Sequence, residues 1–231
     1  TDIQGENAGA PVNARDNWWG TVEVLNMIAN VRGRVDINPI LDGPGKDAKS
    51  LVLPLLGEIP ESIRSDSYLL LANSPYRVKK ETVIENGARL FIEPGVTLEY
   101  DQGAFINVKD GGITAAGSRD LPVIFTASGL SDSPGFYRNA VKFTEKTAVN
   151  SSFQFCVFRY SETAIDIYFG APEITFCEIY RNSQNGIYCR NDSAPIISYS
   201  SFRENGGEGA VKCVGMSRPR INFNSFEKNT L

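Results

Sequence analysis

Four segments of the C-terminal half share one pattern: "NAVKFTEK" (residues 139–146), "TAIDIYFG" (163–170), "NGIYCRND" (185–192) and "GAVKCVGM" (209–216). The small residue in the second position of each segment recurs at intervals of 24, 22 and 24 residues. Each segment leads into another, which reads "SSFQFCVF", "PEITFCEI", "PIISYSSF" or "PRINFNSF". Such a short period, with two or three short strands per unit, is not typical of helical repeats and indicates a β-solenoid.

Apolar and polar residues alternate in these segments, as in a strand with one buried face. In the first segments the pattern predicts the inward pairs Val141/Phe143, Ile165/Ile167, Ile187/Cys189 and Val211/Cys213. In the second segments it predicts the inward pairs Phe153/Phe155, Ile174/Phe176, Ile197/Tyr199 and Ile221/Phe223. A third inward residue follows at Phe158, Ile179, Phe202 and Phe226. One unit alone cannot bury these side chains, but stacked units form a continuous core.

A polar turn ends each unit and places Asn182, Asn205 and Asn229 in register, with Ser161 in the same position of the preceding unit. A column of asparagines can form hydrogen bonds from coil to coil and tolerates a tight backbone. Strands and turns together predict an all-β parallel β-helix of about six or seven coils.

The middle of the chain supports this fold through "LFIEPGVTLEY" (90–100), "AFINVKDGGITAAGS" (104–118) and "PVIFTAS" (122–128). These stretches resemble the opening coils of right-handed parallel β-helix proteins of the pectin-lyase-like type. The resemblance covers about residues 75–231 and implies a right-handed, single-stranded solenoid. It also implies an extracytoplasmic location (periplasm, cell surface or secreted), because this fold is common outside the cell. It implies little about activity, since the fold carries lyases, hydrolases, adhesins and scaffolds.

The N-terminal segments "VNARDNWWG" (12–20) and "GRVDINPIL" (33–41) resemble the closing end of such a β-helix, although here they come first. We therefore expect residues 1–41 to form a closing coil, belonging either to a preceding domain or to the open end of another copy. Residues 42–70 are expected to be a linker and residues 71–231 a β-helix with an open C-terminal end. Open coils expose strand edges, which favours end-to-end self-association or packing on a neighbouring β-helix domain.

Adjacent residues of a strand point to opposite sides, so at most one of Trp18 and Trp19 can face a core. We interpret this pair mainly as a structural lid, with sugar stacking as the alternative.

Composition excludes several classes of site. The chain has no histidine, so a Ser-His-Asp triad, a Cys-His pair and a His-ligated zinc site are impossible within it. Its four cysteines form no CxxC pair, and its net charge of −4 argues against nucleic-acid binding. No apolar run is long enough for a membrane helix. We therefore predict no cofactor, no metal, no nucleic-acid partner and no membrane insertion.

The outward positions of the first strands supply the candidate binding site. Stacked coils would gather one acid, two tyrosines and three cations in a patch roughly 15 Å long. Tyrosines can stack on sugar rings, and cations can pair with uronate or sulfate groups. The candidate carbohydrate-binding residues are Lys142, Asp166, Tyr168, Tyr188, Arg190 and Lys212. The alternative is that these residues only stabilise the sheet through cross-strand pairs.

Catalysis by this fold needs clustered carboxylates, and Asp166 is the only one in the patch. We therefore predict no catalytic residues and a non-catalytic scaffold that binds polysaccharide on an outward face. The alternative function is a polysaccharide lyase or glycoside hydrolase. Cys156/Cys177 and Cys189/Cys213 occupy equivalent positions of successive coils, so each pair is either a strained disulfide or two thiols. We favour buried thiols that pack as small apolar side chains.

Overall fold

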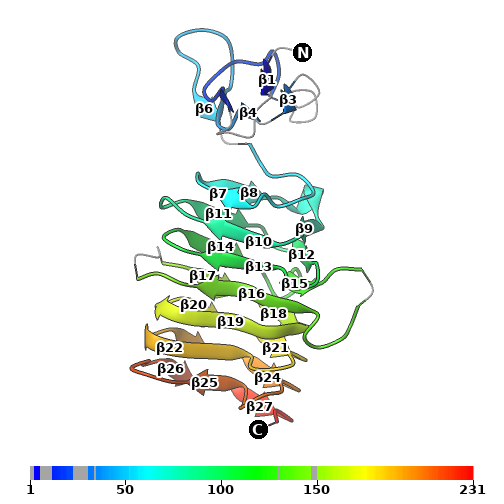
Figure 1. The fold of residues 1–231 in the computed structure, drawn as a ribbon, viewed down its shortest axis with the longest axis vertical. Coiled ribbons are helices and arrows are strands. Elements are labelled where there is room, and N and C mark those ends of the chain that lie inside the picture. Colours follow the sequence, from blue (N-terminus) through cyan, green and yellow to red (C-terminus); the bar gives the residue numbers. More distant parts are fainter. Residues whose placement is uncertain are drawn as a thin grey trace. The chain divides into compact units, whose positions relative to one another are not determined.

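A computed structural model describes residues 3–5, 12–22, 31–33, 35–51, 53–129, 131–146 and 150–230. The chain divides into two compact units, residues 1–54 and 55–231. The larger unit is the solenoid expected from the repeats, and its strands stack coil upon coil (Figure 1).

Three parallel sheets of seven strands each form the larger unit, which confirms the expected parallel β-helix with seven coils. The first sheet contains β7 (Ser62–Ile63), β10 (Glu81–Ile84), β13 (Phe105–Val108), β16 (Tyr137–Phe143), β19 (Ser161–Gly170), β22 (Ile187–Ser193) and β25 (Val211–Cys213). The second contains β8 (Ser67–Leu69), β11 (Arg89–Ile92), β14 (Gly112–Ala116), β17 (Ser152–Gln154), β20 (Glu173–Thr175), β23 (Ile196–Ser198) and β26 (Arg220–Asn222). The third contains β9 (Tyr76–Val78), β12 (Thr97–Tyr100), β15 (Val123–Ala127), β18 (Cys156–Arg159), β21 (Glu178–Tyr180), β24 (Ser201–Arg203) and β27 (Ser225–Glu227). A 3-10 turn, η1 (Leu71–Asn73), lies between β8 and β9.

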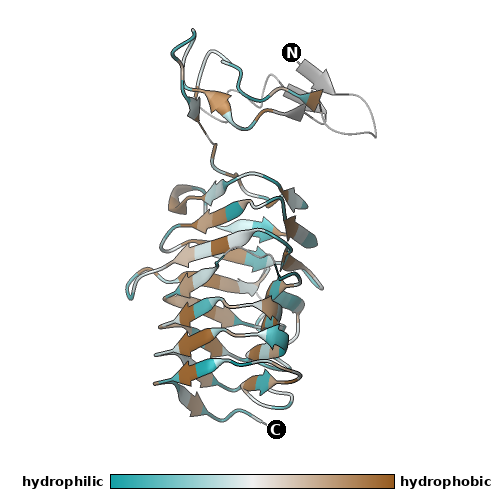
Figure 2. Cartoon of the chain, turned by 90° about the vertical axis from the view of Figure 1, so that its left-hand side faces the viewer, coloured by the Kyte–Doolittle hydropathy of each residue, from teal (hydrophilic) through white to brown (hydrophobic). Residues whose placement is uncertain are grey.

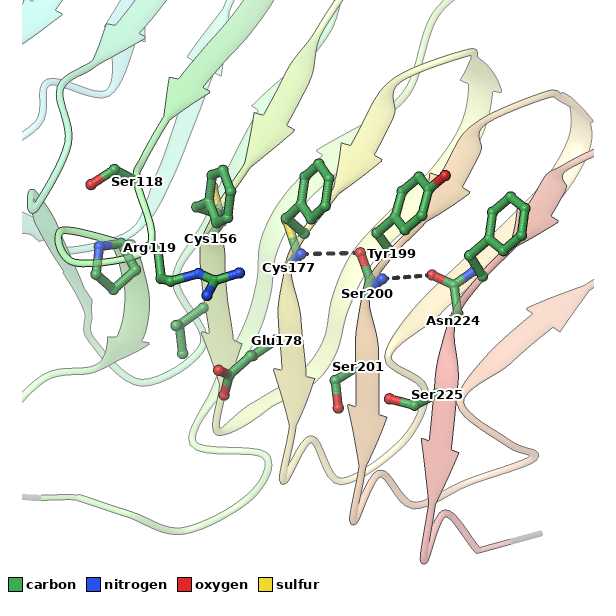
Figure 3. A pocket seen from close by; sticks show the side chains of 15 residues that line it. Ser118, Arg119, Cys156, Cys177, Glu178, Tyr199, Ser200, Ser201, Asn224 and Ser225 are labelled. Atoms are coloured by element: carbon green, nitrogen blue, oxygen red, sulfur yellow. Dashed lines mark hydrogen bonds between the residues drawn. The ribbon is translucent and has the colours of Figure 1, made fainter.

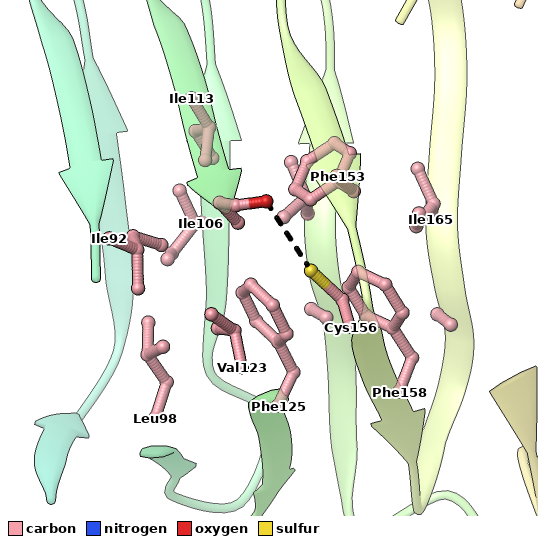
Figure 4. Packing of buried hydrophobic residues seen from close by; sticks show 14 of the residues in the cluster. Ile92, Leu98, Ile106, Ile113, Val123, Phe125, Phe153, Cys156, Phe158 and Ile165 are labelled. Carbon is pink, nitrogen blue, oxygen red and sulfur yellow. Dashed lines mark hydrogen bonds between the residues drawn. The ribbon is translucent and has the colours of Figure 1, made fainter. Parts of the chain in front are cut away.

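The core runs through all the coils, because equivalent apolar residues lie above one another. In the first sheet Val141 pairs with Ile165, and Ile165 with Ile187, and all three are fully buried. Successive strands accordingly carry apolar residues at matching positions (Figure 2). In the interior the rings of Phe125 and Phe158 stack with centroids 4.5 Å apart (Figure 4). The inward positions predicted for the first strands are therefore confirmed on β16, β19 and β22. On β25, which has a neighbouring strand on one side only, Val211 is half-buried and Cys213 is exposed, and Phe226 of the same coil is exposed as well.

The second strands differ from the prediction at one position per coil. Phe155, Phe176, Tyr199 and Phe223 do not face the core, and the last three are exposed. Each adopts a positive φ, between 49° and 56°, at the corner between the second and third sheets. A left-handed residue bends the chain and shifts the alternation by one step. The next residue therefore points inward in its place, as Cys156 and Cys177 do.

The asparagine column lies at the corner between the third and first sheets, and the structure confirms it. The carboxamide oxygen of Asn182 accepts hydrogen bonds from the backbone N–H (3.0 Å) and hydroxyl (2.6 Å) of Ser161. The amide Nδ2 of Asn182 donates to Asn205 Oδ1 (2.8 Å), and Nδ2 of Asn205 donates to Asn229 Oδ1 (2.9 Å). Ser161, Asn182 and Asn205 are fully buried, so the column satisfies backbone groups that water cannot reach.

The N-terminal unit contains three short strand pairs. The pairs β1 (Ile3–Gly5) with β3 (Val31–Gly33) and β2 (Val12–Asn13) with β4 (Val35–Asp36) are parallel, and β5 (Ile40–Leu41) with β6 (Ser50–Leu51) is antiparallel. Trp19 packs on the buried Ile40 and Leu53, and Trp18 is half-buried. The closing-coil role of this segment and end-to-end association stay predictions.

The expected linker at 42–70 is instead divided between the two units. Its first part completes the β5–β6 hairpin, and its last part contributes β7 and β8 to the first coil. The β-helix therefore begins before residue 71. The physical reason is that Ile59, Ile63 and Leu69 are buried in the solenoid core.

The asparagine column yields a stability prediction. Replacing Asn205 by alanine leaves the Asn182 amide without its acceptor, and we expect the free energy of unfolding to fall by about 3 kcal/mol. The exposed strand residue Gln154 is the control, because Gln154→Ala should change stability by less than about 0.5 kcal/mol. Urea denaturation followed by circular dichroism measures both values. Equal midpoints for the two variants would contradict the role of the column.

Candidate functional site

The six candidate residues predicted from sequence lie together on the outward face of the first sheet. Lys142, Asp166, Tyr188 and Lys212 are register partners on β16, β19, β22 and β25. Tyr168 and Arg190 follow two residues further along β19 and β22. With neighbouring strands about 4.8 Å apart, the group extends for about 14 Å along the solenoid. We call these six residues the first-sheet ridge.

Asp166 and Arg190 form the centre of the ridge. The guanidinium donates two hydrogen bonds to the carboxylate, from Nε to Oδ1 (2.9 Å) and from Nη2 to Oδ2 (2.6 Å). The Asp166 side chain is only 6% exposed and that of Arg190 is 26% exposed. Burial opposes the charge on Arg190, but the hydrogen bonds to Asp166 and the electrostatic attraction of Asp166, Tyr168 and Tyr188 together raise the pKa of the guanidinium.

Cations cover both tyrosine rings of the ridge. Arg190 lies 4.0 Å from the ring centroid of Tyr168 and 4.1 Å from that of Tyr188. Lys142 also lies over Tyr168 (5.1 Å), and Lys212 over Tyr188 (4.9 Å). Such cation–π contacts hold the rings and charges in a fixed arrangement. The rings are therefore engaged within the ridge and are less open to sugar stacking than the sequence alone indicates.

The ridge has a lysine at each end, and the two lysines differ in their partners. No ion pair is found for Lys142 among the residues that the structure describes, whereas Lys212 pairs with the exposed Glu208. The hydrogen bond to Glu208 raises the pKa of Lys212, so this ammonium stays charged at neutral pH. Asp166 is sealed by Arg190 and is poorly placed to exchange protons with a substrate. The described residues contain no group of three or more metal-ligating side chains.

Sequence reasoning missed a second surface feature, a groove of about 460 Å³ at the corner between the second and third sheets (Figure 3). One side of the groove is formed by the four corner aromatics, which were expected to face the core. Their recurrence one residue before Cys156, Cys177, Ser200 and Asn224 is the signal that could have revealed an outward column.

All four cysteines are free thiols. Cys156 and Cys177 are buried in the core, and burial raises the pKa of Cys156 well above its ordinary value. Cys189 and Cys213 are register partners on β22 and β25, and only Cys213 is exposed. Its hydrogen bond with Cys189 lowers the pKa of Cys213 to about 7.

The family model for the right-handed β-helix region matches residues 104–231, more than half of the chain. The chain belongs to the right-handed β-helix family. This membership establishes the handedness of the solenoid and agrees with its three parallel sheets. Comparison with curated proteins and with solved structures gave no match. No helix within the described part of the chain is long and apolar enough to cross a membrane.

The buried ion pair yields a second stability prediction. Arg190→Met leaves the buried Asp166 carboxylate unpaired and should lower the free energy of unfolding by about 3 kcal/mol. The double variant Asp166→Asn/Arg190→Met should regain part of this loss, because it removes the unpaired charge. Arg203→Met is the control, since Arg203 pairs with Glu178 at the surface and should cost less than about 1 kcal/mol. Urea denaturation of the wild type and the three variants measures the free energy of unfolding of each. Equal decreases for Arg190→Met and Arg203→Met would contradict the prediction.

The thiols yield a prediction on pH. Because the thiolate is the reactive form, alkylation of Cys213 by iodoacetamide should accelerate as the pH rises through about 7. Mass spectrometry of peptides after short labelling measures the rate at each cysteine. Cys156, Cys177 and Cys189 should stay unlabelled in the folded protein because they are buried. The Cys213→Ser variant is the control and should lose the rapid phase.

Proposed function

We propose that the protein is a non-catalytic extracytoplasmic β-helix scaffold that binds an acidic polysaccharide along the first-sheet ridge. The observation that carries the proposal is the state of Asp166, the one carboxylate among the six residues. It is buried and neutralised by Arg190, so the ammonium of Lys142 and that of Lys212, whose partner Glu208 is exposed, are the charges that the ridge offers to a ligand.

The spacing of the cations supports a polymeric ligand. Lys142 and Lys212 belong to coils three steps apart, about 14 Å, with Arg190 between them. A single anionic group cannot reach both lysines, whereas a chain bearing repeated uronate or sulfate groups can. The cation–π contacts order these side chains before binding, which lowers the entropic cost of binding.

The non-catalytic assignment rests on the same geometry. Hydrolysis of a glycosidic bond uses two carboxyl groups within roughly 10 Å of each other that are free to exchange protons. The ridge offers only Asp166, and both of its oxygens accept hydrogen bonds from Arg190. An extracytoplasmic location fits such a ligand, since acidic polysaccharides of this kind are found outside the cytoplasm.

Affinity electrophoresis through gels containing polygalacturonate tests the proposal, with dextran gels as the neutral reference. The wild type should be retarded by polygalacturonate and not by dextran, and added salt should weaken the retardation. The double variant Lys142→Ala/Lys212→Ala should lose the retardation.

The matched control is Lys80→Ala/Lys228→Ala, which removes the same charge from exposed positions outside the ridge. It should be retarded like the wild type. Equal loss in the two double variants would indicate nonspecific attraction and overturn the assignment of the ridge. Absence of retardation in the wild type would also overturn it.

A further inference from the structure

The groove at the corner between the second and third sheets is lined by a ladder of stacked aromatic rings. The centroids of Phe155 and Phe176 are 5.0 Å apart, those of Phe176 and Tyr199 5.1 Å, and those of Tyr199 and Phe223 5.0 Å. Neighbouring rings are parallel within 12°. Phe176 and Tyr199 are 43% and 53% exposed although each is stacked on both sides. The ladder therefore presents a continuous row of ring edges to solvent.

Polar groups form the other side of the groove in the same register. Glu178, Ser201 and Ser225 are strand partners on β21, β24 and β27 (Figure 3). Each lies two residues after Phe176, Tyr199 or Phe223, so three coils contribute one aromatic edge and one carboxylate or hydroxyl, while the coil of Phe155 contributes Val157 at this position. Such a lining suits a ligand with one apolar and one hydroxyl-bearing side in each repeat.

Arg119 marks one end of the groove. Its exposed side chain comes from the loop between β14 and β15 and reaches in beside Glu178 (Figure 3). Within the described parts of the chain it forms neither a hydrogen bond nor an ion pair. Its donors are therefore available to a ligand, while Glu178 is bonded weakly to Arg203 (3.4 Å). Beyond Glu178, the polar side of the groove consists of the uncharged hydroxyls of Ser201 and Ser225.

We propose that this groove binds an extended, neutral, β-linked glycan lying along the solenoid axis, with one sugar ring per coil. The spacing of the ladder supports this ligand. In an extended β-linked glycan, the length per sugar residue is close to the distance between successive ring centroids of the ladder. The CH faces of the sugars lie against the ring edges, and their hydroxyls meet Glu178, Ser201 and Ser225. An extended peptide fits less well, since its side chains recur on one face about every 6.6 Å.

The proposal is independent of the first-sheet ridge, which lies on another sheet and is expected to take an acidic polymer. Isothermal titration calorimetry with cellohexaose tests it, and maltohexaose, whose α-linked chain curls, tests the requirement for an extended form. Tyr199→Ala interrupts the ladder, and Ser201→Trp fills the groove while the ladder is kept. Both variants should weaken cellohexaose binding at least tenfold, and maltohexaose should bind at least tenfold more weakly than cellohexaose.

Tyr68→Ala is the matched control, because Tyr68 stacks on Phe91 (centroids 4.9 Å apart) and is exposed like Tyr199 (38% and 53%), but lies outside the groove. It should bind cellohexaose like the wild type. The proposal is overturned if cellohexaose does not bind, or if maltohexaose binds as tightly. It is also overturned if binding survives in Ser201→Trp. If only Lys142→Ala/Lys212→Ala lost cellohexaose binding, the binding site would be the first-sheet ridge, and the assignment of the groove would be overturned.

Discussion

The corners of the coils carry the strain on which the stacking depends. At two corners of each C-terminal coil a residue that is not glycine adopts a positive φ, for example Phe176 (56°) and Arg181 (53°). Each such residue costs on the order of 1 kcal/mol, so the surrounding structure must hold it in place. The side chain that follows it does so, since Asn182 accepts the backbone N–H of Ser161 in the preceding coil. At the other corner Ser200 accepts the N–H of Cys177 (3.1 Å) in the same way.

This device couples neighbouring coils and gives the two corners different surfaces. A left-handed residue directs its own side chain outward and the next one inward. At the corner between the second and third sheets the outward residues are aromatic, and their stacking produces the ladder. At the corner between the third and first sheets they include Arg181 and Glu204, which form an exposed ion pair (2.8 Å). The same positive-φ conformation therefore places aromatic side chains on the surface at one corner and charged side chains on the surface at the other.

In the first-sheet ridge, burial and pairing decide whether a charged side chain is available to a ligand. In the sequence Asp166 cannot be told from an exposed aspartate, but in the sheet it lies beneath Arg190 and is almost removed from solvent. Removing either partner leaves a charge in a poorly solvated place, which explains why the pair is held by two short hydrogen bonds. The centre of the ridge is consequently a buried carboxylate held by one guanidinium, with the tyrosine rings fixed around it.

The sequence by itself determined the solenoid, the inward residues of the first strands, the asparagine column and the six members of the ridge. These follow from the period of about two along a strand and the recurrence of equivalent residues, both of which are local properties. Only the tertiary structure decided the direction of Phe155, Phe176, Tyr199 and Phe223, because one left-handed residue reverses the alternation without changing the spacing. It also decided that Asp166 is sealed and that the solenoid begins before residue 71, since burial depends on which side chains of neighbouring coils meet.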